Sequence, residues 1–401
     1  MFSFQTQLSM CEGQSQKGIN DMKIGLLGFG VVGRGVYDIL ADREDVSVGR
    51  ILCRRDLGEL SAPTTRDMAD ILADAEIDTV VEVMGGLHPA YEYVEAALRA
   101  GKHVVTSNKY LLCHYYRELT ALAKAHGVTL RGTAAVGGGI PWLTNLEKAA
   151  RVDRLHKISG IMNGTTNYIM DAMNQSDVDF DEVLAKAQAL GYAEADPSAD
   201  IDGWDIQRKL IISADVAFGV SLREEDVPVF GIRNVTAADI RRFQAHGRTC
   251  KLIASAEKLA DSVAAYVEPT LLTAEALEAA VPANFNLISL EGEYAGKQSF
   301  FGQGAGRYPT AYNVVQDLVD IANGKRGFYT EEFLAADTNN AGALHPYYVR
   351  TQAKLPELEA MAREDWDGAI VTLPVIVAQM HSLLKKLLEQ DPQSLIAAVS
   401  N

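Results

Sequence analysis

Two lysines of this chain stand where a side chain could pass a proton to a bound substrate. Lys109 follows a short predicted strand, residues 103–106, and open α/β sheets bind ligands beyond the carboxyl ends of their strands. Lys209 lies four residues after Asp205 in a segment with helical periodicity, so these two side chains share one helix face. A lysine ammonium can give a proton to a forming alkoxide and stabilise its charge. The alternatives are a solvated surface lysine at 109 and a surface ion pair at 205 and 209.

A glycine-rich turn follows the first apolar segment, residues 23–27, and leads into a helical pattern through Val36 and Leu40. The spacing is GxGxxG between a strand and a helix, which is the context that dinucleotide binding requires. The glycines permit a tight turn and a close approach to a pyrophosphate, and the helix N-terminus offers free N–H groups to it. A purely structural turn is the alternative. The expected cofactor contacts in this turn are Gly28, Phe29, Gly30, Val31, Val32 and Gly33.

The type of dinucleotide depends on the residues that follow the second expected strand, 48–52. This region contains Arg54, Arg55 and Asp56. A carboxylate here holds the ribose 2′-hydroxyl of NAD, whereas an arginine accommodates the 2′-phosphate of NADP. We expect NADP(H), with Arg54 as a ligand. The alternative is that both arginines are solvated and that Asp56 serves NAD.

Further cofactor contacts are expected where later strands end. Residues 78–84 form a buried type of strand that ends at Gly85, and the strand before Lys109 ends at Thr106 and Ser107. A second glycine turn, at 302–310, leads into another helix, and its Gly304 is expected to lie near the cofactor. These positions place the cofactor along one edge of a parallel sheet.

Three other stretches are rich in groups that could bind a ligand. The loop 132–141 has three consecutive glycines, which suits backbone groups that face a ligand or an ion, although a turn between domains explains it equally well. The polar cluster 163–167 precedes a helix and resembles a capping signal. Acidic residues crowd the segment 194–205. The last two stretches could bind a small polar substrate.

The length and the alternation of strand and helix patterns predict an α/β protein of several domains. We expect a Rossmann-type nucleotide domain at 23–152 and an α+β substrate and dimerisation domain, with a mostly antiparallel sheet, at 153–303. Residues 304–330 are expected to return to the nucleotide domain. Residues 331–401 suggest a small α/β unit that docks on the main body or on a second subunit, and residues 1–22 a flexible extension.

Composition excludes several classes of partner. The chain has 401 residues and a formal net charge of −16, whereas nucleic acid and anionic membranes need clustered Lys and Arg. No apolar run approaches the roughly 18 residues of a membrane span. The four cysteines have neither metal-site nor disulfide spacing. We therefore expect no nucleic acid and no membrane as partner, and a reducing compartment such as the cytoplasm.

Taken together, the motifs between about residues 23 and 325 resemble the homoserine dehydrogenase family. The motifs that carry the resemblance are GLLGFGVVGRGV at 25–36, EVMGG at 82–86, AGKHVVTSNK at 100–109, MNGTTNYI at 162–169, GYAEADPSADIDGWDIQRK at 191–209 and GAGRYPTA at 304–311. The resemblance implies NAD(P)H-dependent interconversion of L-aspartate 4-semialdehyde and L-homoserine, on the route to threonine, methionine and isoleucine. It also implies a homodimer or homotetramer.

The resemblance also implies roles for individual residues. It implies that Glu194 and Asp205 bind the substrate, that Lys209 donates the proton and that Lys109 supports it. From the chemistry of the polar cluster we expect Thr165, with Gly164 beside it, to bind the substrate carboxylate. There are two rival hypotheses. The chain could be a reductase that acts on a different amino-acid semialdehyde, or an NAD(P)-sensing regulator without turnover.

The chain departs from the family's pattern in three places. The family usually has a glutamate that helps to bind a sodium ion where Thr133 stands. The remaining candidate ligands are the backbone carbonyls of Val136, Gly138 and Ile140.

Tyr110 and Cys113 replace small residues and predict a bulkier wall. Many members carry a C-terminal ACT module that senses threonine, and here the tail suggests a shortened ACT-like unit, which leaves a threonine effector open.

Overall fold

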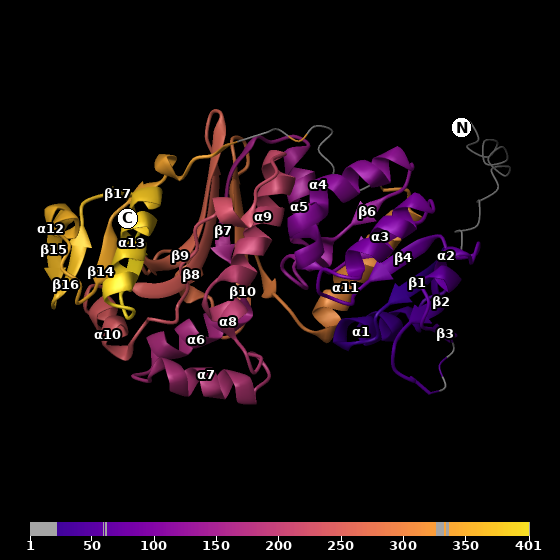
Figure 1. The fold of residues 1–401 in the computed structure, drawn as a ribbon, viewed down its shortest axis with the longest axis horizontal. Helices are drawn as coiled ribbons and strands as arrows, with labels where there is room; N and C mark the ends of the chain where they lie inside the picture. The colour runs from indigo at the N-terminus through magenta and orange to yellow at the C-terminus, as the bar shows by residue number, and fades with distance from the viewer. Residues whose placement is uncertain (1–21, 59, 61, 326–332, 334–336, 401) are drawn as a thin grey trace, which may run out of the picture.

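The computed structural model describes residues 22–58, 60, 62–325, 333 and 337–400, and Figure 1 shows two halves side by side. The right half holds the N-terminal strands, and the left half holds a larger sheet and the C-terminal elements. The expected flexible extension lies outside the described residues, except for Met22, which begins the first strand. Most of the irregular stretch expected after residue 331 lies outside them as well. No helix in the described part of the chain is long and apolar enough to cross a membrane.

The nucleotide half is built on a six-stranded sheet in the order β3-β2-β1-β4-β5-β6. Each neighbouring pair of strands is parallel. This is the strand order of a Rossmann fold, so the predicted fold of this half is confirmed. The strands are β1 (Met22–Leu27), β2 (Val46–Leu52), β3 (Thr64–Thr65), β4 (Thr79–Glu82), β5 (His103–Thr106) and β6 (Leu130–Arg131).

Helices cover this sheet, which explains why its central strands β1 and β4 are almost entirely buried. They are α1 (Val31–Leu40), α2 (Ala69–Leu72), α3 (Ala90–Arg99), α4 (Lys109–Ala125) and, from much later in the chain, α11 (Arg307–Ala322). α11 packs on α1, where a Cβ on Gly35 would lie 3.0 Å from the Ala311 side chain. The segment after residue 304 therefore returns to this half (Figure 1).

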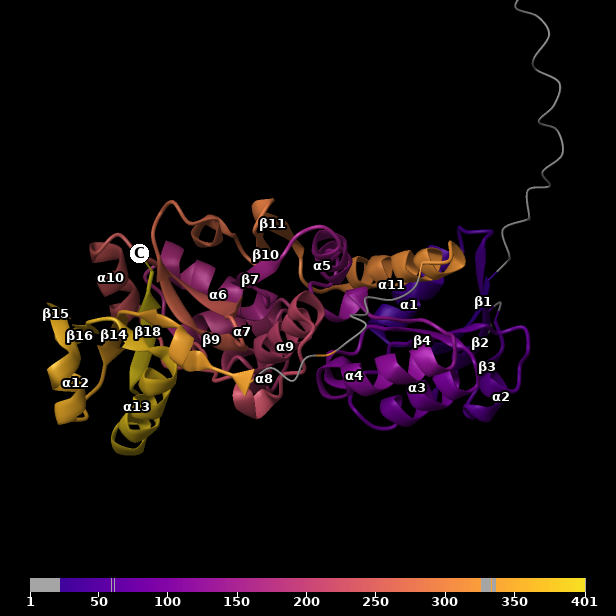
Figure 2. The ribbon, with the colours of Figure 1, turned by 90° about the horizontal axis from the view of Figure 1, so that it is seen from above.

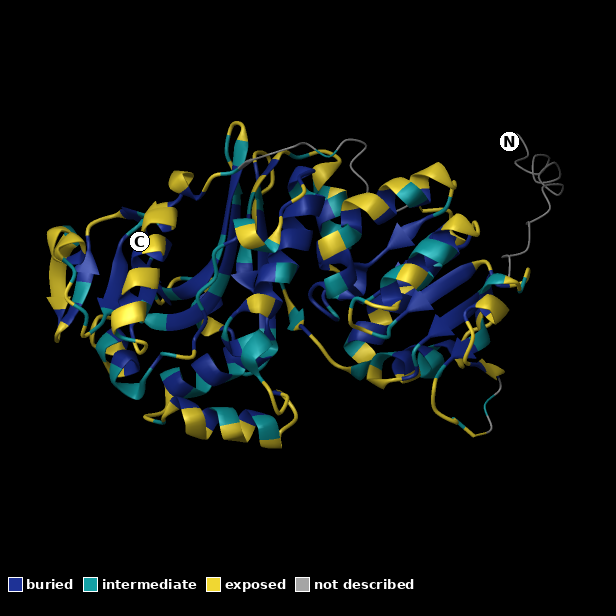
Figure 3. Ribbon diagram, in the orientation of Figure 1, coloured by how far each residue is buried: buried dark blue, intermediate teal, exposed yellow. Residues whose placement is uncertain are grey.

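The second half is built on a ten-stranded sheet. Its first part is antiparallel, as predicted: β7 (Leu155–Ile161), β8 (Thr249–Lys258), β9 (Ser262–Leu272), β10 (Phe285–Gly292) and β11 (Gly296–Gln303). The sequence analysis missed β11, which forms the sheet edge and whose mostly exposed residues show no regular alternation of apolar and polar side chains. Figure 3 shows the strands of both sheets largely buried and the outer helices exposed on one side.

The helices of this half include α5 (Trp142–Ala150), α6 (Gly164–Gln175), α7 (Phe180–Ala189), α8 (Ser198–Ile201), α9 (Trp204–Phe218) and α10 (Ala237–Ala245). Short 3-10 turns are η1 (Thr133–Ala135), η2 (Glu224–Asp226), η3 (Leu277–Ala280) and η4 (Asn340–Gly342). α9 is buried along most of its length and packs against α4 and α5. The indole of Trp142 in α5 donates a hydrogen bond to Ser213 of α9 at 2.9 Å. α9 thus lies where the two halves meet.

The C-terminal residues extend the large sheet. They form β12 (Asp337–Thr338), β13 (Leu344–His345), β14 (Tyr347–Arg350), α12 (Pro356–Met361), β15 (Ala362–Trp366), β16 (Ala369–Thr372), β17 (Val375–Ile376), α13 (Val377–Gln390) and β18 (Leu395–Val399). This unit has a βαββαβ order, formed by β14, α12, β15, β16, α13 and β18. β18 pairs in parallel with β9, so this unit docks on the main body, at the end far from the nucleotide half (Figure 2).

Candidate active site

The nucleotide turn has the geometry that a pyrophosphate needs. Gly28 has φ +96°, a conformation that suits glycine. A Cβ on Gly33 would collide with the carbonyl of Gly28, whereas a Cβ on Gly30 would meet nothing within 4 Å. α1 begins at Val31, and no side chain caps it, so its first N–H groups can bind an anion. These residues fit a dinucleotide.

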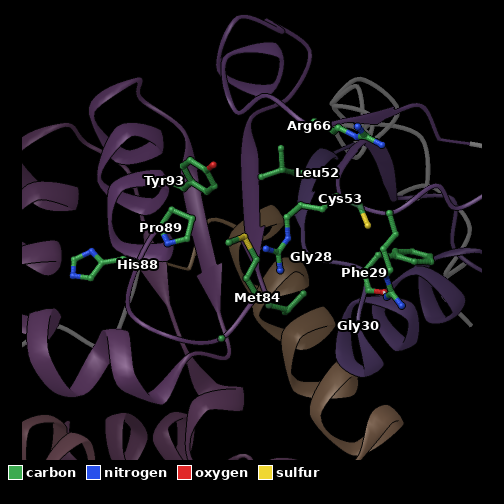
Figure 4. A pocket seen from close by; sticks show the side chains of 14 residues that line it. Gly28, Phe29, Gly30, Leu52, Cys53, Arg66, Met84, His88, Pro89 and Tyr93 are labelled. Atoms are coloured by element: carbon green, nitrogen blue, oxygen red, sulfur yellow. The ribbon is translucent and has the colours of Figure 1, made fainter.

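A cavity of about 430 Å³ opens beside this turn. Figure 4 shows Phe29 and Cys53 on one side of it and His88, Pro89 and Tyr93 on the other. Its wall includes the predicted contacts Gly28, Phe29, Gly30, Arg54 and Gly85.

Arginines make this cavity positive. Arg54, Arg55 and Arg66 line it, and the Arg55 guanidinium donates to the carbonyl of Phe29 at 3.0 Å. Asp56, the candidate NAD ligand, instead accepts from the backbone N–H of Gly58 at 3.0 Å. The sequence analysis missed Arg66, because it lies outside the glycine motif and beyond the second strand.

The other predicted cofactor residues are not among the described residues that line this cavity. Val31 is exposed and lines an adjoining hollow with Arg34 and Arg307. Val32 and Gly33 form the first turn of α1. Thr106 and Ser107 end β5. Gly304 is buried against the side chain of Asn286 and is not among the described residues that line the cavity.

A buried glutamate joins the ends of β4 and β5. Glu82 accepts hydrogen bonds from Thr106 Oγ1 at 2.6 Å, from the backbone N–H of Met84 at 2.8 Å and from that of Gly85 at 3.3 Å. Burial raises its pKa, although these donors oppose the effect. Glu82 therefore holds the turn that borders the cofactor cavity. A charged residue inside an apolar strand was the signal that could have identified it.

Lys109 and Lys209 meet at one carboxylate. α4 begins at Lys109, where the side chain of Asn108 caps the helix by accepting from the N–H of Leu111. Lys109 Nζ donates to Asp205 Oδ1 across the boundary between the halves. Lys209 Nζ donates to Asp205 Oδ2 at 2.8 Å and to the carbonyl of Met162 at 2.8 Å. The structure thus brings together the three charged residues that the sequence placed in two separate motifs.

The carboxylate of Asp205 is only 2% exposed. Burial by itself would raise its pKa, but the charges of Lys209 and Lys109 outweigh burial and hold the pKa below the usual value. Burial likewise would lower the pKa of Lys109, but the charge of Asp205 raises it above the usual value. Asp205 is therefore ionised at neutral pH, and Lys109 is protonated.

A second carboxylate lies next to this group. Asn163, the N-cap of α6, donates through Nδ2 to Asp205 Oδ2 at 2.7 Å and to Asp200 Oδ1 at 2.8 Å. Burial and the nearby charge of Asp205 raise the pKa of Asp200. The sequence analysis assigned no role to Asn163 or Asp200, although both belong to motifs that it identified.

The remaining predicted substrate residues, which the structure describes, form no hydrogen bond or ion pair with the Lys109–Asp205–Lys209 group. Glu194 is exposed, and no described residue forms a hydrogen bond or ion pair with its carboxylate. The hydroxyl of Thr165 donates to the carbonyl of Tyr192. Gly164 begins α6, close to the carbonyl of Asn284. The structure therefore does not join Glu194 to the Lys109–Asp205–Lys209 group.

The bulky side chains after Lys109 pack towards α9. The ring of Tyr110 lies 4.4 Å from the guanidinium carbon of Arg208, which in turn pairs with Glu224 at 2.6 Å. Cys113 is buried, and its Sγ lies 3.9 Å from Glu224 Oε1. Burial raises the pKa of this thiol. The bulkier wall expected from Tyr110 and Cys113 thus lies against Arg208 and Glu224.

The glycine loop at the domain boundary, which includes Val136, Gly138 and Ile140, is buried. The side-chain amide of Asn313 donates to the carbonyl of Gly138 at 2.6 Å and to that of Ile140 at 3.1 Å. Two of the three carbonyls expected to bind sodium therefore already have a hydrogen-bond donor.

A Rossmann sheet with an uncapped helix N-terminus at its glycine turn, next to two lysines on one buried carboxylate, is typical of a nicotinamide-dependent oxidoreductase. Residues 28–132 match the family model described as homoserine dehydrogenase, NAD binding domain, and residues 141–319 match the model described as homoserine dehydrogenase. The chain belongs to the homoserine dehydrogenase family. Its members act on a CH–OH group, and so the chain is an oxidoreductase of that class with a nicotinamide cofactor.

Individual relatives agree with this assignment. The homoserine dehydrogenase of Bacillus subtilis is 39% identical over 319 residues, which is 76% of this chain and 74% of that protein. The crystal structure of a homoserine dehydrogenase from Thiobacillus denitrificans is 32% identical, with a TM-score of 0.84, over 95% of this chain and 98% of that chain. A hyperthermophilic archaeal homoserine dehydrogenase mutant in complex with NADPH is 25% identical, with a TM-score of 0.66, over 76% of this chain and 98% of that chain.

Proposed function

We propose that this enzyme interconverts L-aspartate 4-semialdehyde and L-homoserine, with Lys209 as proton donor and Lys109 as the supporting lysine. The observation that carries the proposal is the buried carboxylate of Asp205 between two ammonium groups. A bound reduced nicotinamide would supply a hydride to the carbonyl carbon, and negative charge would then develop on the carbonyl oxygen. Lys209 Nζ gives a proton to that oxygen, so that an O–H bond forms as an N–H bond breaks.

Asp205 supports this chemistry by holding both lysines. Its two oxygens accept from Lys109, Lys209 and Asn163, which leaves it little capacity for a further donor. We therefore assign the substrate ammonium mainly to Asp200 and Glu194, with Asp205 adding its charge. Gly164, at the N-terminus of α6, and Thr165 serve the substrate carboxylate, because a helix N-terminus favours an anion.

The proposed activity can be tested by following the absorbance of the reduced nicotinamide with L-homoserine and either NADP or NAD. Turnover with homoserine supports the proposal. Turnover only with another amino-acid alcohol would support the rival semialdehyde reductase. Cofactor binding without turnover of any such substrate would support a sensor.

We propose NADP as the preferred cofactor. The support is the positive wall of Arg54, Arg55 and Arg66, because guanidinium groups bind phosphate in bidentate geometry. Asp56, the residue that would serve NAD, is engaged by its own loop. A ratio of kcat/KM for NADP over NAD below one would contradict this preference.

We also propose a homodimer or homotetramer that uses the sheet of the second half, as the family resemblance implies. The βαββαβ order of the C-terminal unit supports an ACT-like module, and its helix α12 of six residues accounts for its shortened appearance in the sequence. Light scattering after size exclusion tests the oligomer, and turnover with and without L-threonine tests the effector. A cytoplasmic location stays a prediction.

The proposal does not include the sodium ion expected at Val136, Gly138 and Ile140. A sodium ion here would compete with any N–H group that already donates to these carbonyls, and a carboxylate beside it would favour its binding by offsetting its charge. Here the amide of Asn313 occupies two carbonyls, and residue 133 is a neutral threonine. The donor set therefore does not fit a sodium ion.

A further inference from the structure

We propose that the side-chain amide of Asn313 takes the place of a bound cation at the glycine loop, so that the boundary between the two halves needs no monovalent cation. The loop connects η1 to α5, and Asn313 lies on α11, which returns from the second half to the nucleotide half. The loop and the segment before the helix thus belong to two of the places where the chain crosses between the halves.

The contacts of Asn313 match those of a small positive group. Its amide nitrogen has two N–H groups, and it lies 2.6 Å from the carbonyl oxygen of Gly138 and 3.1 Å from that of Ile140. The opposite orientation of the amide would place its oxygen against two carbonyl oxygens, which repel it. Asn313 is fully buried, and its Oδ1 has no hydrogen-bond partner among the described residues. The side chain thus leaves its own oxygen unpaired in order to supply both carbonyls.

Backbone atoms just before α11 lie close to the glycine loop. Gly138 has φ +55°, and a Cβ there would lie 2.5 Å from the carbonyl of Gly304. The N–H of Gly139 donates to the carbonyl of Gln303 at 3.0 Å. The two crossings are therefore joined directly, backbone to backbone, next to Asn313.

The carboxylate of Asp317, near the loop, is engaged by protein groups as well. Thr133 donates to Asp317 through its hydroxyl at 2.7 Å and through its backbone N–H at 2.9 Å. Arg131 pairs with Asp317 at 2.9 Å and with Asp320 at 3.0 Å. No carboxylate stands at position 133 to attract a cation.

One face of α11 contacts both the glycine loop and the residues just before it. Asn313 and Asp317 are four residues apart and share this face. Asn313 supplies donors to the carbonyls of the glycine loop, and Asp317 accepts from the residues that precede it. The neutral amide of Asn313 thereby satisfies the loop carbonyls that a cation, together with a glutamate, would otherwise satisfy.

The test compares melting temperatures of the full-length protein in NaCl, KCl and choline chloride at equal ionic strength. For the unmodified protein we expect values that agree within about 1 °C, because ligands stabilise only what they bind. Stabilisation by Na⁺ or K⁺ of more than about 3 °C over choline would overturn the proposal.

Asn313→Asp keeps the shape of the side chain but replaces both N–H donors with an acceptor. The carbonyls of Gly138 and Ile140 then face a carboxylate, and so this variant should melt lower in choline and regain about 3 °C or more in Na⁺ or K⁺. Asn313→Ala, which removes the donor without adding charge, covers the case in which the aspartate variant does not fold.

The matched control is Asn323→Asp, just past the end of the same helix, where the amide donates to one carbonyl at an exposed site. It should respond alike to all three salts. If neither Asn313 variant gains a cation response that exceeds the response of this control, the amide does not replace a cation.

Discussion

The ammonium of Lys109 and the carboxylate of Asp205 form an ion pair between residues 96 positions apart in the chain. Lys109 begins the helix that follows β5 of the nucleotide sheet, whereas Asp205 lies in the first turn of α9 in the other half. This ion pair joins the nucleotide half, which holds the cofactor cavity, to the helix that holds Lys209. Substitutions at these residues should therefore have distinguishable effects on cofactor binding, on proton transfer and on the stability of the fold.

Replacement of Lys209 by alanine should remove most turnover and leave cofactor binding intact. General acid catalysis contributes about 10²- to 10⁴-fold, and we expect a loss of kcat in that range. Fluorescence titration with NADPH measures cofactor binding independently. Lys385→Ala, on the exposed surface of α13, is the matched control. Turnover of Lys209→Ala close to that of the control would contradict its assignment as proton donor.

The oxidation of homoserine should accelerate as pH rises. In this direction a lysine must accept the proton and so must be neutral, whereas an ordinary lysine is charged below a pKa of about 10.4. The charge of Asp205 raises the pKa of Lys109 further, so Lys109 stays charged at neutral pH. Initial rates from about pH 6 to about pH 10 measure the profile. A flat profile would argue against a lysine as proton carrier.

Asp205→Asn should move this profile towards lower pH. The substitution removes the negative charge that raises the pKa of Lys109, so the lysine loses its proton more easily. The variant should also be less stable, by about 3–5 kcal/mol, because both lysines lose their buried partner. The rate profile, normalised to its own maximum, separates the two effects. An unshifted profile would mean that Asp205 does not control the ionisation of Lys109.

The variants Arg54→Ala and Arg66→Ala should each weaken the binding of NADPH more than the binding of NADH. A hydrogen bond to a charged group contributes about 1.5–3 kcal/mol, which corresponds to roughly a tenfold to hundredfold rise in KM. The KM for NADH should change little. Arg43→Ala, which loses only a surface pair with Asp45, is the control. An equal effect on both cofactors would show that these arginines do not discriminate between them.

Glu268 should make the docking of the C-terminal unit sensitive to acid. It is fully buried in β9 and lies 2.7 Å from His345 and 3.0 Å from His381. Burial alone would raise its pKa, but the two histidines lower it to about 2. Since the folded value lies below the ordinary value of 4.5, the stabilisation is present above that value and is lost as pH falls towards 2.

Glu268→Gln removes this stabilisation. At neutral pH it should cost about 3–5 kcal/mol, and the variant should lose less stability than the unmodified protein when acidified. Unfolding at several pH values measures both effects. Glu357→Gln, in an exposed pair with Lys386, should change stability by less than about 1 kcal/mol. A similar response of the two variants to acid would contradict the role of Glu268.

The sequence alone determined the features that depend on neighbours in the chain. The turn from Gly28 to Gly33 is a local conformation, and Asp205 and Lys209 lie on one helix face because of the helical repeat. The motifs that carry the resemblance are contiguous as well. Family, nucleotide turn and proton donor candidates could therefore be predicted without coordinates.

Only the tertiary structure decided which distant groups meet. The pairing of Lys109 with Asp205, the place of Asn163 and Asp200 beside them, and the contact of Asn313 with the glycine loop all depend on packing between the halves. Hydrogen bonds and ion pairs act over a few ångströms, and nothing in the local sequence reports such a distance. For the same reason the sequence suggested a cation at the loop, whereas the fold supplies an amide from a helix 175 residues further along.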